Sequence, residues 1–297
     1  MFSMTAFAAL APDQQYLQSV QAITGYNQFI TGQSAPGNLP ASPAIDQSAT
    51  ALTNARTVSM NWFNQVYPAC LDVPQTITGG SAAITGGLQE LTSLASQLAA
   101  DPGNQQLSQA VASTAGQLTG EVTALQSSCA GLGNTLSQYA GSLQSAVGGL
   151  QSSLGGLQGL LNQLNAQLCQ DIARLNSLQH ATCPNQGDIN AAAGVVQNDQ
   201  QALANTANFA NQLNQCGQSA GAALSGLSYL AGTWNQLAAL AENAVQALQS
   251  INGQPAVVIQ LDLQQASQAW QGLLAQLSSI STLAAARSAT AEPVAAG

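Results

Sequence analysis

Apolar residues recur four and three positions apart along one long stretch of the chain, from Val111 to Leu178. The first part of this stripe comprises Val111, Ala115, Leu118, Val122, Leu125, Cys129, Leu132, Leu136, Tyr139 and Leu143. After a four-residue step it continues through Val147, Leu150, Leu154, Leu157, Leu161, Leu164 and Leu168, and a second step leads to Ile172 and Leu175. Such spacing keeps one side of an α-helix apolar, and steps of this size locally unwind a supercoil without ending it. The stretch predicts a single helix of about 115 Å, which needs partner helices of similar length.

Proline and glycine divide the rest of the chain into further helices. A short helix is expected over residues 13–30, followed by a loop. The next helix should start near Ser42, because Pro43 suits the first helical position. Pro68 and Pro74 are expected to bend or interrupt it. Three short segments then predict reversals of the chain, at residues 101–103, 183–188 and 252–255.

Between the reversals the sequence predicts the long helix, a returning helix and a closing helix. The long helix spans about residues 104–181, the returning helix runs to about Ser250 with Asp188 as its N-cap, and the closing helix covers about 257–286. Short connections between long helices make neighbours antiparallel. We therefore expect an all-α fold, an elongated antiparallel bundle of four to five long helices.

In domain terms, residues 1–41 should form a short helix and loop, and residues 42–286 the elongated bundle with a tip at about 183–196. Residues 287–297 are expected to be a flexible tail. The opening Met1–Pro12 segment is apolar but short, and it lacks the basic leader of a secretory signal.

Charge is almost absent from this chain and excludes several function classes. Only 5% of the residues are charged, the sole cations are Arg56, Arg174 and Arg287, and the net charge is −9. Such a chain cannot neutralise a row of phosphates, which excludes nucleic acid as a partner and, for the same reason, static attraction to anionic lipid. The chain is nevertheless 46% hydrophobic, and its leucines are periodic, which argues against disorder.

Residues that could carry chemistry are sparse. His180 is the single histidine, and it lies just before a predicted turn, where a polar residue is common. No Cys-x-x-Cys pair exists, the glycine pairs lack a P-loop lysine, and Asp171 and Arg174 are spaced as an intrahelical pair. The sequence indicates no catalytic residue, no metal site and no cofactor, and hence no enzyme.

The cysteines and tryptophans give packing expectations. If the chain reverses near Pro102, Cys70 comes within a turn or two of Cys129, so a disulfide between them is feasible if their Cα atoms approach within about 7 Å. Trp62, Trp234 and Trp270 lie on apolar helix faces and are expected to anchor the core.

Glycines crowd the long helix, and two interpretations stay open for them. They are Gly148, Gly149, Gly155, Gly156 and Gly159. Glycine inside a helix costs up to about 1 kcal/mol relative to alanine. Either these positions weaken a helix that must rearrange, or they make room for bulky residues of a partner helix.

The order of these elements resembles the α-helical pore-forming toxins related to cytolysin A, in particular the haemolysin BL and non-haemolytic enterotoxin components and their tripartite relatives. The resemblance covers about residues 45–283. It is carried by Asn54-Ala55-Arg56, Asn61-Trp62-Phe63, Val66-Tyr67-Pro68, the long helix, Leu227–Leu230 with Trp234, Leu237 and Leu240, and Leu261-Asp262-Leu263 with Ala266, Trp270 and Leu273.

The resemblance implies a secreted, soluble protein that converts to a membrane-bound oligomer. Its implied partners are the lipid bilayer of a target cell and homologous toxin components, in a homo- or hetero-oligomer. Family members insert a hydrophobic segment between their third and fourth helices, whereas the corresponding Cys183–Asp188 turn here is short and polar. The apolar piece Ile189–Val196 is too short to span a bilayer. The residues expected at the tip are Cys183, Pro184, Ile189, Val195 and Val196.

Two versions of the toxin hypothesis follow, together with two alternatives. The chain is the hydrophilic component of a multipart toxin, or the glycine-rich segment Gly141–Leu161 itself refolds to line a pore. The alternatives are a structural or adhesive coiled-coil protein and a small helical secretion-system substrate of the mycobacterial kind. The last is weakened because Thr233-Trp234-Asn235 does not match the Trp-x-Gly motif of that class.

Overall fold

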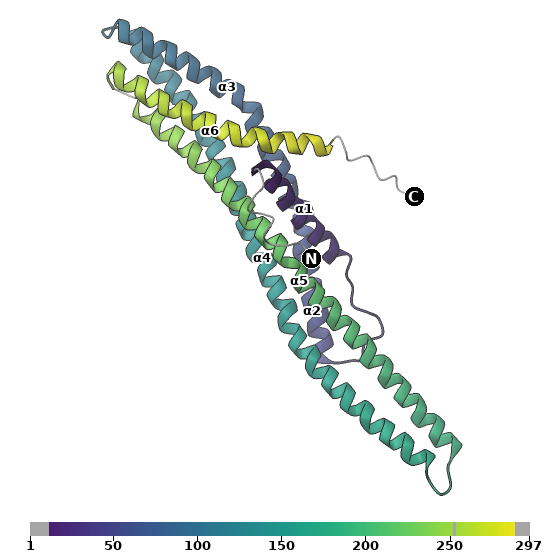
Figure 1. Cartoon of the computed structure of the whole chain (residues 1–297). Coiled ribbons are helices and arrows are strands. Elements are labelled where there is room, and N and C mark those ends of the chain that lie inside the picture. The colour runs from purple at the N-terminus through teal and green to yellow at the C-terminus, as the bar shows by residue number, and fades with distance from the viewer. Residues whose placement is uncertain (1–11, 252–253, 289–297) are drawn as a thin grey trace. The chain divides into compact units, whose positions relative to one another are not determined.

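The chain is described by a computed structural model over residues 12–251 and 254–288, and Figure 1 shows helices joined by short connections. Their bounds are α1 (Pro12–Thr31), α2 (Pro43–Asn61), a π-helical turn (Trp62–Val66), α3 (Tyr67–Ala100), α4 (Gln105–Gln179), α5 (Gln186–Ser250) and α6 (Ala256–Ser288). The described part of the chain contains no strand, so the all-α prediction is confirmed. The expectations for Met1–Pro12 and for the tail after Arg287 lie almost wholly outside the described residues.

Polar side chains start three of the helices by accepting backbone N–H groups that have no partner within the helix. The Ser42 hydroxyl accepts from Ala44 N ahead of α2, and the Asn104 side chain accepts from Gln106 N and Leu107 N ahead of α4. At α5 the cap is Asn185, whose Oδ1 lies 2.9 Å from Gly187 N. The prediction of Asp188 as this N-cap is wrong, because the helix begins two residues earlier.

Proline shapes the passage from α2 to α3. Pro68 has no N–H to donate to the carbonyl four residues earlier, and the chain forms the π-helical turn Trp62–Val66 directly before it. Pro74 lies inside α3, which continues to Ala100. The expected irregularity is therefore concentrated ahead of Pro68, and Pro74 does not end the helix.

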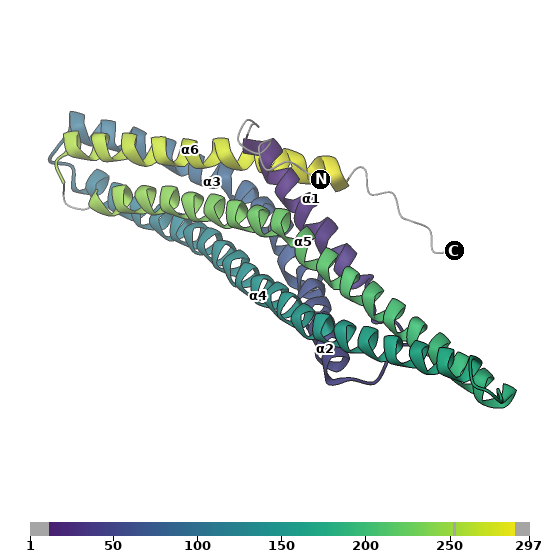
Figure 2. The same ribbon diagram turned by 60° about the horizontal axis from the view of Figure 1, so that its bottom comes forward.

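The chain divides into two compact units, each made of segments distant in sequence. Unit 1 comprises Met1–Ala22, Phe63–Ala140 and Ser225–Gly297, and unit 2 comprises Ile23–Trp62 and Gly141–Leu224. In unit 1, α3 and α6 pack together, and both views show them beside the first part of α4 and the last part of α5 (Figures 1 and 2).

The core of unit 1 combines buried indoles with places where helices approach closely. Trp234 and Trp270 are fully buried, and Trp270 Nε1 donates to Thr85 Oγ1 at 3.1 Å. At two glycines the neighbouring helix is so near that an added Cβ would come within 2.5 Å of Leu118 on α4 (from Gly87) or of Asn235 on α5 (from Gly133). These contacts fix α4 between its antiparallel neighbours α3 and α5.

Unit 2 is built on the second half of α4 and the first half of α5, with α2 and the end of α1 beside them. Trp62 is fully buried there, and its Nε1 donates to Thr24 Oγ1 at 3.1 Å. An added Cβ at Gly156 would meet Ala44 of α2 at 3.5 Å. Gln212 Nε2 donates to Gln33 Oε1, so side-chain amides, not charges, link the elements of this unit.

All five cysteines are free thiols in the structure. Cys70, Cys129 and Cys216 are buried, whereas Cys169 and Cys183 are exposed. Burial raises the pKa of Cys70 to about 12 and those of Cys129 and Cys216 to about 11. The contact of Gly87 with Leu118 sets a register that leaves Cys70 and Cys129 about six residues out of step, or about 9 Å along the helix axis. This offset explains why the structure contains no Cys70–Cys129 bond.

We predict that replacing Gly226 with alanine loosens unit 1. The added Cβ would lie 3.1 Å from the Ser19 carbonyl oxygen and 3.2 Å from Ser19 Cα, so the backbone of α1 would have to move. Overpacking of this kind costs about 1–3 kcal/mol. Gly232→Ala is the matched control on α5, because nothing lies within 4 Å of its added Cβ, and it should stabilise by up to about 1 kcal/mol. Urea unfolding measures both changes, and equal effects of the two variants would contradict the close α1–α5 approach.

Thiol titration provides the second test. The native protein should react with a disulfide reagent near pH 8 at Cys169 and Cys183 alone, because the raised pKa values and burial protect the other three thiols. In denaturant without reductant all five should react. A count of three in denaturant, with Cys70 and Cys129 missing from the labelled peptides, would instead demonstrate the disulfide between them.

Candidate interaction site: the arm of the α4–α5 hairpin

The most distinctive surface of unit 2 is the end of its α4–α5 hairpin. Figures 1 and 2 both show the two helices continuing past the start of α2 with no further helix beside them. We call residues 158–204 the hairpin arm; it contains the end of α4, the reversal and the start of α5. At its base, Asn205 Nδ2 donates to the Asn38 carbonyl, so the loop between α1 and α2 flanks this part of α5.

The apolar seam of the arm is only half covered. The α4 leucines that continue the long stripe are neither buried nor fully exposed; they are Leu160, Leu161, Leu164, Leu168, Leu175 and Leu178. On α5, Ala192 and Val196 are buried at 8% and 9% exposure. Two helices alone cannot surround a seam residue on all sides, and the arm is therefore held together by less apolar burial than the rest of the hairpin.

The residues expected at the tip differ in their surroundings. Cys183 and Pro184 are exposed in the reversal, and Ile189 is half-buried on the first turn of α5. Val195 is 43% exposed, whereas its neighbour Val196 is buried in the seam. Of these five residues, Cys183, Pro184 and Val195 are thus open to a partner or a lipid surface in this form of the protein.

Two carboxyl groups face each other across the arm. Asp171 lies on α4 and Asp199 on α5, and burial, a hydrogen bond with Asp171 and the charge of Asp171 together raise the pKa of Asp199. Asp199 Oδ2 is shielded from solvent and receives no hydrogen bond from a donor. The Gln167 amide donates to Asp171 Oδ2 at 2.7 Å, whereas the sequence predicted Arg174 as the partner of Asp171. In this pair, two acidic side chains of opposite helices face each other.

Sequence reasoning identified Asp171 but not its facing partner. The signal was present, because a reversal near residue 184 places Asp171 level with Asp199. The spacing of Asp171 and Arg174 drew attention to one helix, while the structure shows that the contact crosses to the other.

No constellation for catalysis or metal binding occurs among the described residues. His180 is exposed at the end of α4, and its Nδ1 lies 2.8 Å from the Asn176 carbonyl oxygen. Nowhere in residues 12–251 and 254–288 do three histidine, cysteine or acidic side chains come together as metal ligands. The geometry gives His180 a helix-end role and no partner for proton transfer.

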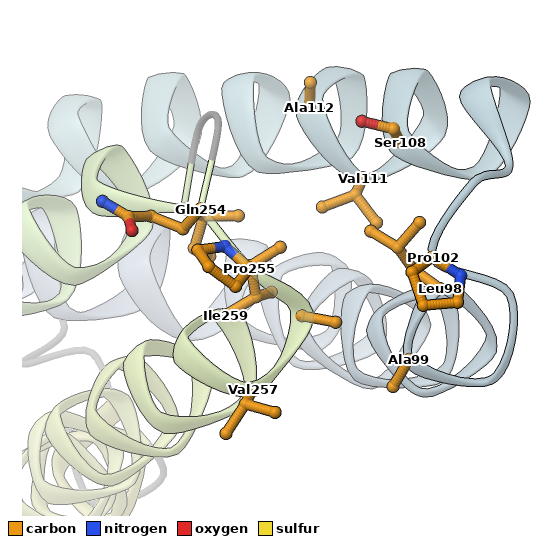
Figure 3. Close-up of a pocket in the computed structure, with 12 residues that line it drawn as sticks. Leu98, Ala99, Pro102, Ser108, Val111, Ala112, Gln254, Pro255, Val257 and Ile259 are labelled. Carbon is orange, nitrogen blue, oxygen red and sulfur yellow. The ribbon is translucent and has the colours of Figure 1, made fainter.

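Two hollows elsewhere offer no reactive groups either. In unit 1 a cavity of about 430 Å³ lies between the α3–α4 turn and the start of α6, and Figure 3 shows mostly aliphatic side chains around it. Its polar lining is limited to Ser108 and Gln254. In unit 2 a shallow hollow beside the arm is lined by amides and small residues of the α1–α2 loop and α5.

The glycines of α4 in unit 2 mostly face open space. An added Cβ would meet nothing within 4 Å at Gly141, Gly148, Gly149, Gly155 and Gly159. Only Gly156 has a neighbour, Ala44. Close helix packing therefore explains one of these glycines, and the others weaken the helix without a packing role in this structure.

No helix in the part of the chain that the structure describes combines the length and apolarity needed to cross a membrane.

Comparison with known proteins was made by sequence and by structure. Neither a protein-family model nor a curated protein sequence matches the chain. Among solved structures, YaxA from Yersinia enterocolitica matches with a TM-score of 0.64 and 10% identity over 92% of this chain and 99% of that chain. XaxA from Xenorhabdus nematophila matches with a TM-score of 0.61 and 10% identity over 93% of this chain and 98% of that chain.

A third structure is the soluble AhlC triple head mutant, from the tripartite α-pore-forming toxin of Aeromonas hydrophila. It has a TM-score of 0.49 and 14% identity over 89% of this chain and 98% of that chain. The fold expected from the sequence resemblance is confirmed by YaxA and XaxA, which share it over nearly the whole of both chains. The chain has the all-helical fold of YaxA and XaxA.

Proposed function

We propose that this chain is a non-enzymatic component of an α-helical pore-forming toxin and acts as the hydrophilic subunit that assembles with others on a target membrane. The observation that carries the proposal is the match of fold to YaxA and XaxA over nearly the whole length of both chains. A fold shared from end to end fits a protein that performs the same kind of assembly, whereas a short shared motif would not.

The character of the arm supports the hydrophilic role. It lies between the two longest helices, where the family carries its membrane-inserting segment, yet its outer faces are amides and its reversal is polar. Uncharged polar faces cost less to bring close to lipid than charged faces do. The proposal therefore places homologous components as the membrane-spanning partners, with this chain released from its cell and converting from a soluble to a membrane-bound form.

The glycine-rich part of α4 supports a second version, in which this chain itself refolds. Five glycines that face open space lower the helical stability of this segment without contributing contacts. In that version the Gln and Ser side of the segment Gly141–Leu161 lines the pore.

Leakage measurements test the proposal directly. The protein should release little dye from zwitterionic vesicles when added alone, and should release dye and lyse red cells together with similar long-helix proteins encoded beside it. Leakage by the protein alone would establish the refolding version. No leakage in any combination, with fibres that form without lipid, would overturn the toxin proposal in favour of a structural coiled-coil protein.

A pair of variants locates the membrane-facing end. Val195→Asp places a charge on an exposed position of the arm, and Val257→Asp does so at the start of α6, where the valine is 77% exposed. A charge costs more to bring close to lipid than an apolar side chain does, so it weakens the approach of whichever end meets the membrane. We expect Val195→Asp to reduce leakage at least about tenfold and Val257→Asp to leave it unchanged. The reverse result would place the lipid contact at the other end of the hairpin.

Alanine substitution separates the two versions. The triple variant Gly141→Ala, Gly148→Ala and Gly155→Ala adds methyl groups in open space and should stabilise α4 by up to about 1 kcal/mol per site. Thermal unfolding checks this gain. If α4 refolds during insertion, lysis by the complete set of components should fall in this variant. Unchanged lysis with raised stability would exclude refolding of the glycine-rich segment.

A further inference from the structure

We propose that the hairpin arm is a pH-gated element, in which the facing carboxyl groups of Asp171 and Asp199 loosen α4 from α5 near neutral pH and close the arm when they share a proton. The proposal rests on the proposed function only for the role that opening of the arm plays in assembly. The pH dependence itself concerns the soluble chain alone.

The geometry leaves the pair without a balancing donor. Asp171 and Asp199 project from opposite helices of the arm and meet in its seam. Asp171 Oδ2 receives one neutral hydrogen bond, from Gln167 Nε2 at 2.7 Å. Asp199 Oδ2 is shielded from solvent and receives none. Two ionised carboxylates in this position can only repel each other, whereas one proton between them supplies the missing donor.

Other charges near the pair are few, and none lies on the flanking loop. On α4, Arg174 follows Asp171 by three residues and is exposed, as are Cys169 and His180. On α5 the remaining acidic residue of the arm is Asp188, in the first turn. Residues 32–42, the loop that packs on α5 at the base of the arm, contain no titratable side chain. The response to pH in the arm is therefore governed by the Asp171–Asp199 pair.

The direction of the effect follows from the direction of the pKa shift. Burial, the hydrogen bond and the charge of Asp171 raise the pKa of Asp199, so the closed arm binds protons more readily than an opened arm does. Above the raised pKa both carboxyls are ionised, and repulsion favours opening. As the pH falls through that pKa the repulsion is lost and the closed form gains stability.

The arm is the part of the chain in which such a small energy matters. Its seam leucines are half-exposed, and only Ala192 and Val196 of its α5 face are buried. Local opening draws on regions with few buried apolar contacts. A like-charge pair at this point therefore shifts the population of open arms, whereas the same pair in the tryptophan-centred cores would be outweighed.

In a pore-forming assembly this device favours opening of the arm near neutral pH. The half-exposed leucines then become available to partner helices, and acidification reseals them.

Hydrogen exchange of the full-length soluble protein tests the proposal without membranes or partners. Peptides covering residues 158–204 should exchange more slowly in Asp199→Asn than in the unmodified protein at about pH 7.5, because asparagine removes the repulsion and donates to Asp171. The energies of like-charge pairs on neighbouring helix positions predict about a 1.5- to twofold change in protection. At a pH below the raised pKa of Asp199, reached by lowering the pH in steps, the unmodified protein should approach the variant after correction for intrinsic exchange rates.

Asp188→Asn is the matched control, because it removes one negative charge from the same arm without touching the pair. It should leave exchange at residues 165–178 unchanged. Equal protection of the unmodified protein at the two pH values, or equal effects of the two variants, would overturn the gate. Because this measurement needs no lysis, a protein that never permeabilises vesicles can still show the gate, and a lytic protein can lack it.

Discussion

The antiparallel packing of α4 on α5 is the interaction on which the rest of the structure depends. Within unit 1, Gly133 of α4 meets Asn235 of α5; within unit 2, Gln151 meets Gly217 and Asp171 faces Asp199. The number of residues between successive contacts is nearly equal on α4 and α5, so the two helices pair in the same register within each unit. Each helix supplies an apolar stripe that the other must cover, since neither could remain folded in water at this length without a partner.

A seam built almost without charge has to be specified by shape and by amides. Gly87, Gly133 and Gly226 leave room for a neighbouring helix. The indole N–H groups of Trp62 and Trp270 donate to the hydroxyls of Thr24 and Thr85. Surface ion pairs would add little to stability in any case. A charged residue in such a seam is therefore informative, and the carboxyl pair of the arm differs from the neutral seam around it.

The helices and their order were predictable from sequence because proline, glycine and asparagine end helices for local steric reasons. The reversal expected at residues 101–103 lies at 101–104, and the one expected at 183–188 lies three residues earlier, at 180–185. What local rules could not supply was any contact between helices. Asn185 and Asp188 are both suitable N-caps, and local rules do not decide which of them starts α5. Whether Asp171 faces Asp199 depends on the register in which α4 and α5 pair across the turn. Likewise, the sequence could not show that most α4 glycines of unit 2 face open space, because this depends on where the neighbouring helices lie.

The scarcity of cations has a further consequence for how this molecule meets proteases. A trypsin-like enzyme finds cleavage sites only at Arg56, Arg174 and Arg287. Arg174 is exposed, but it sits within a helix that has to unwind before the peptide bond can enter a protease cleft. The rate of cleavage after Arg174 therefore reports how often α4 is locally unwound in the arm.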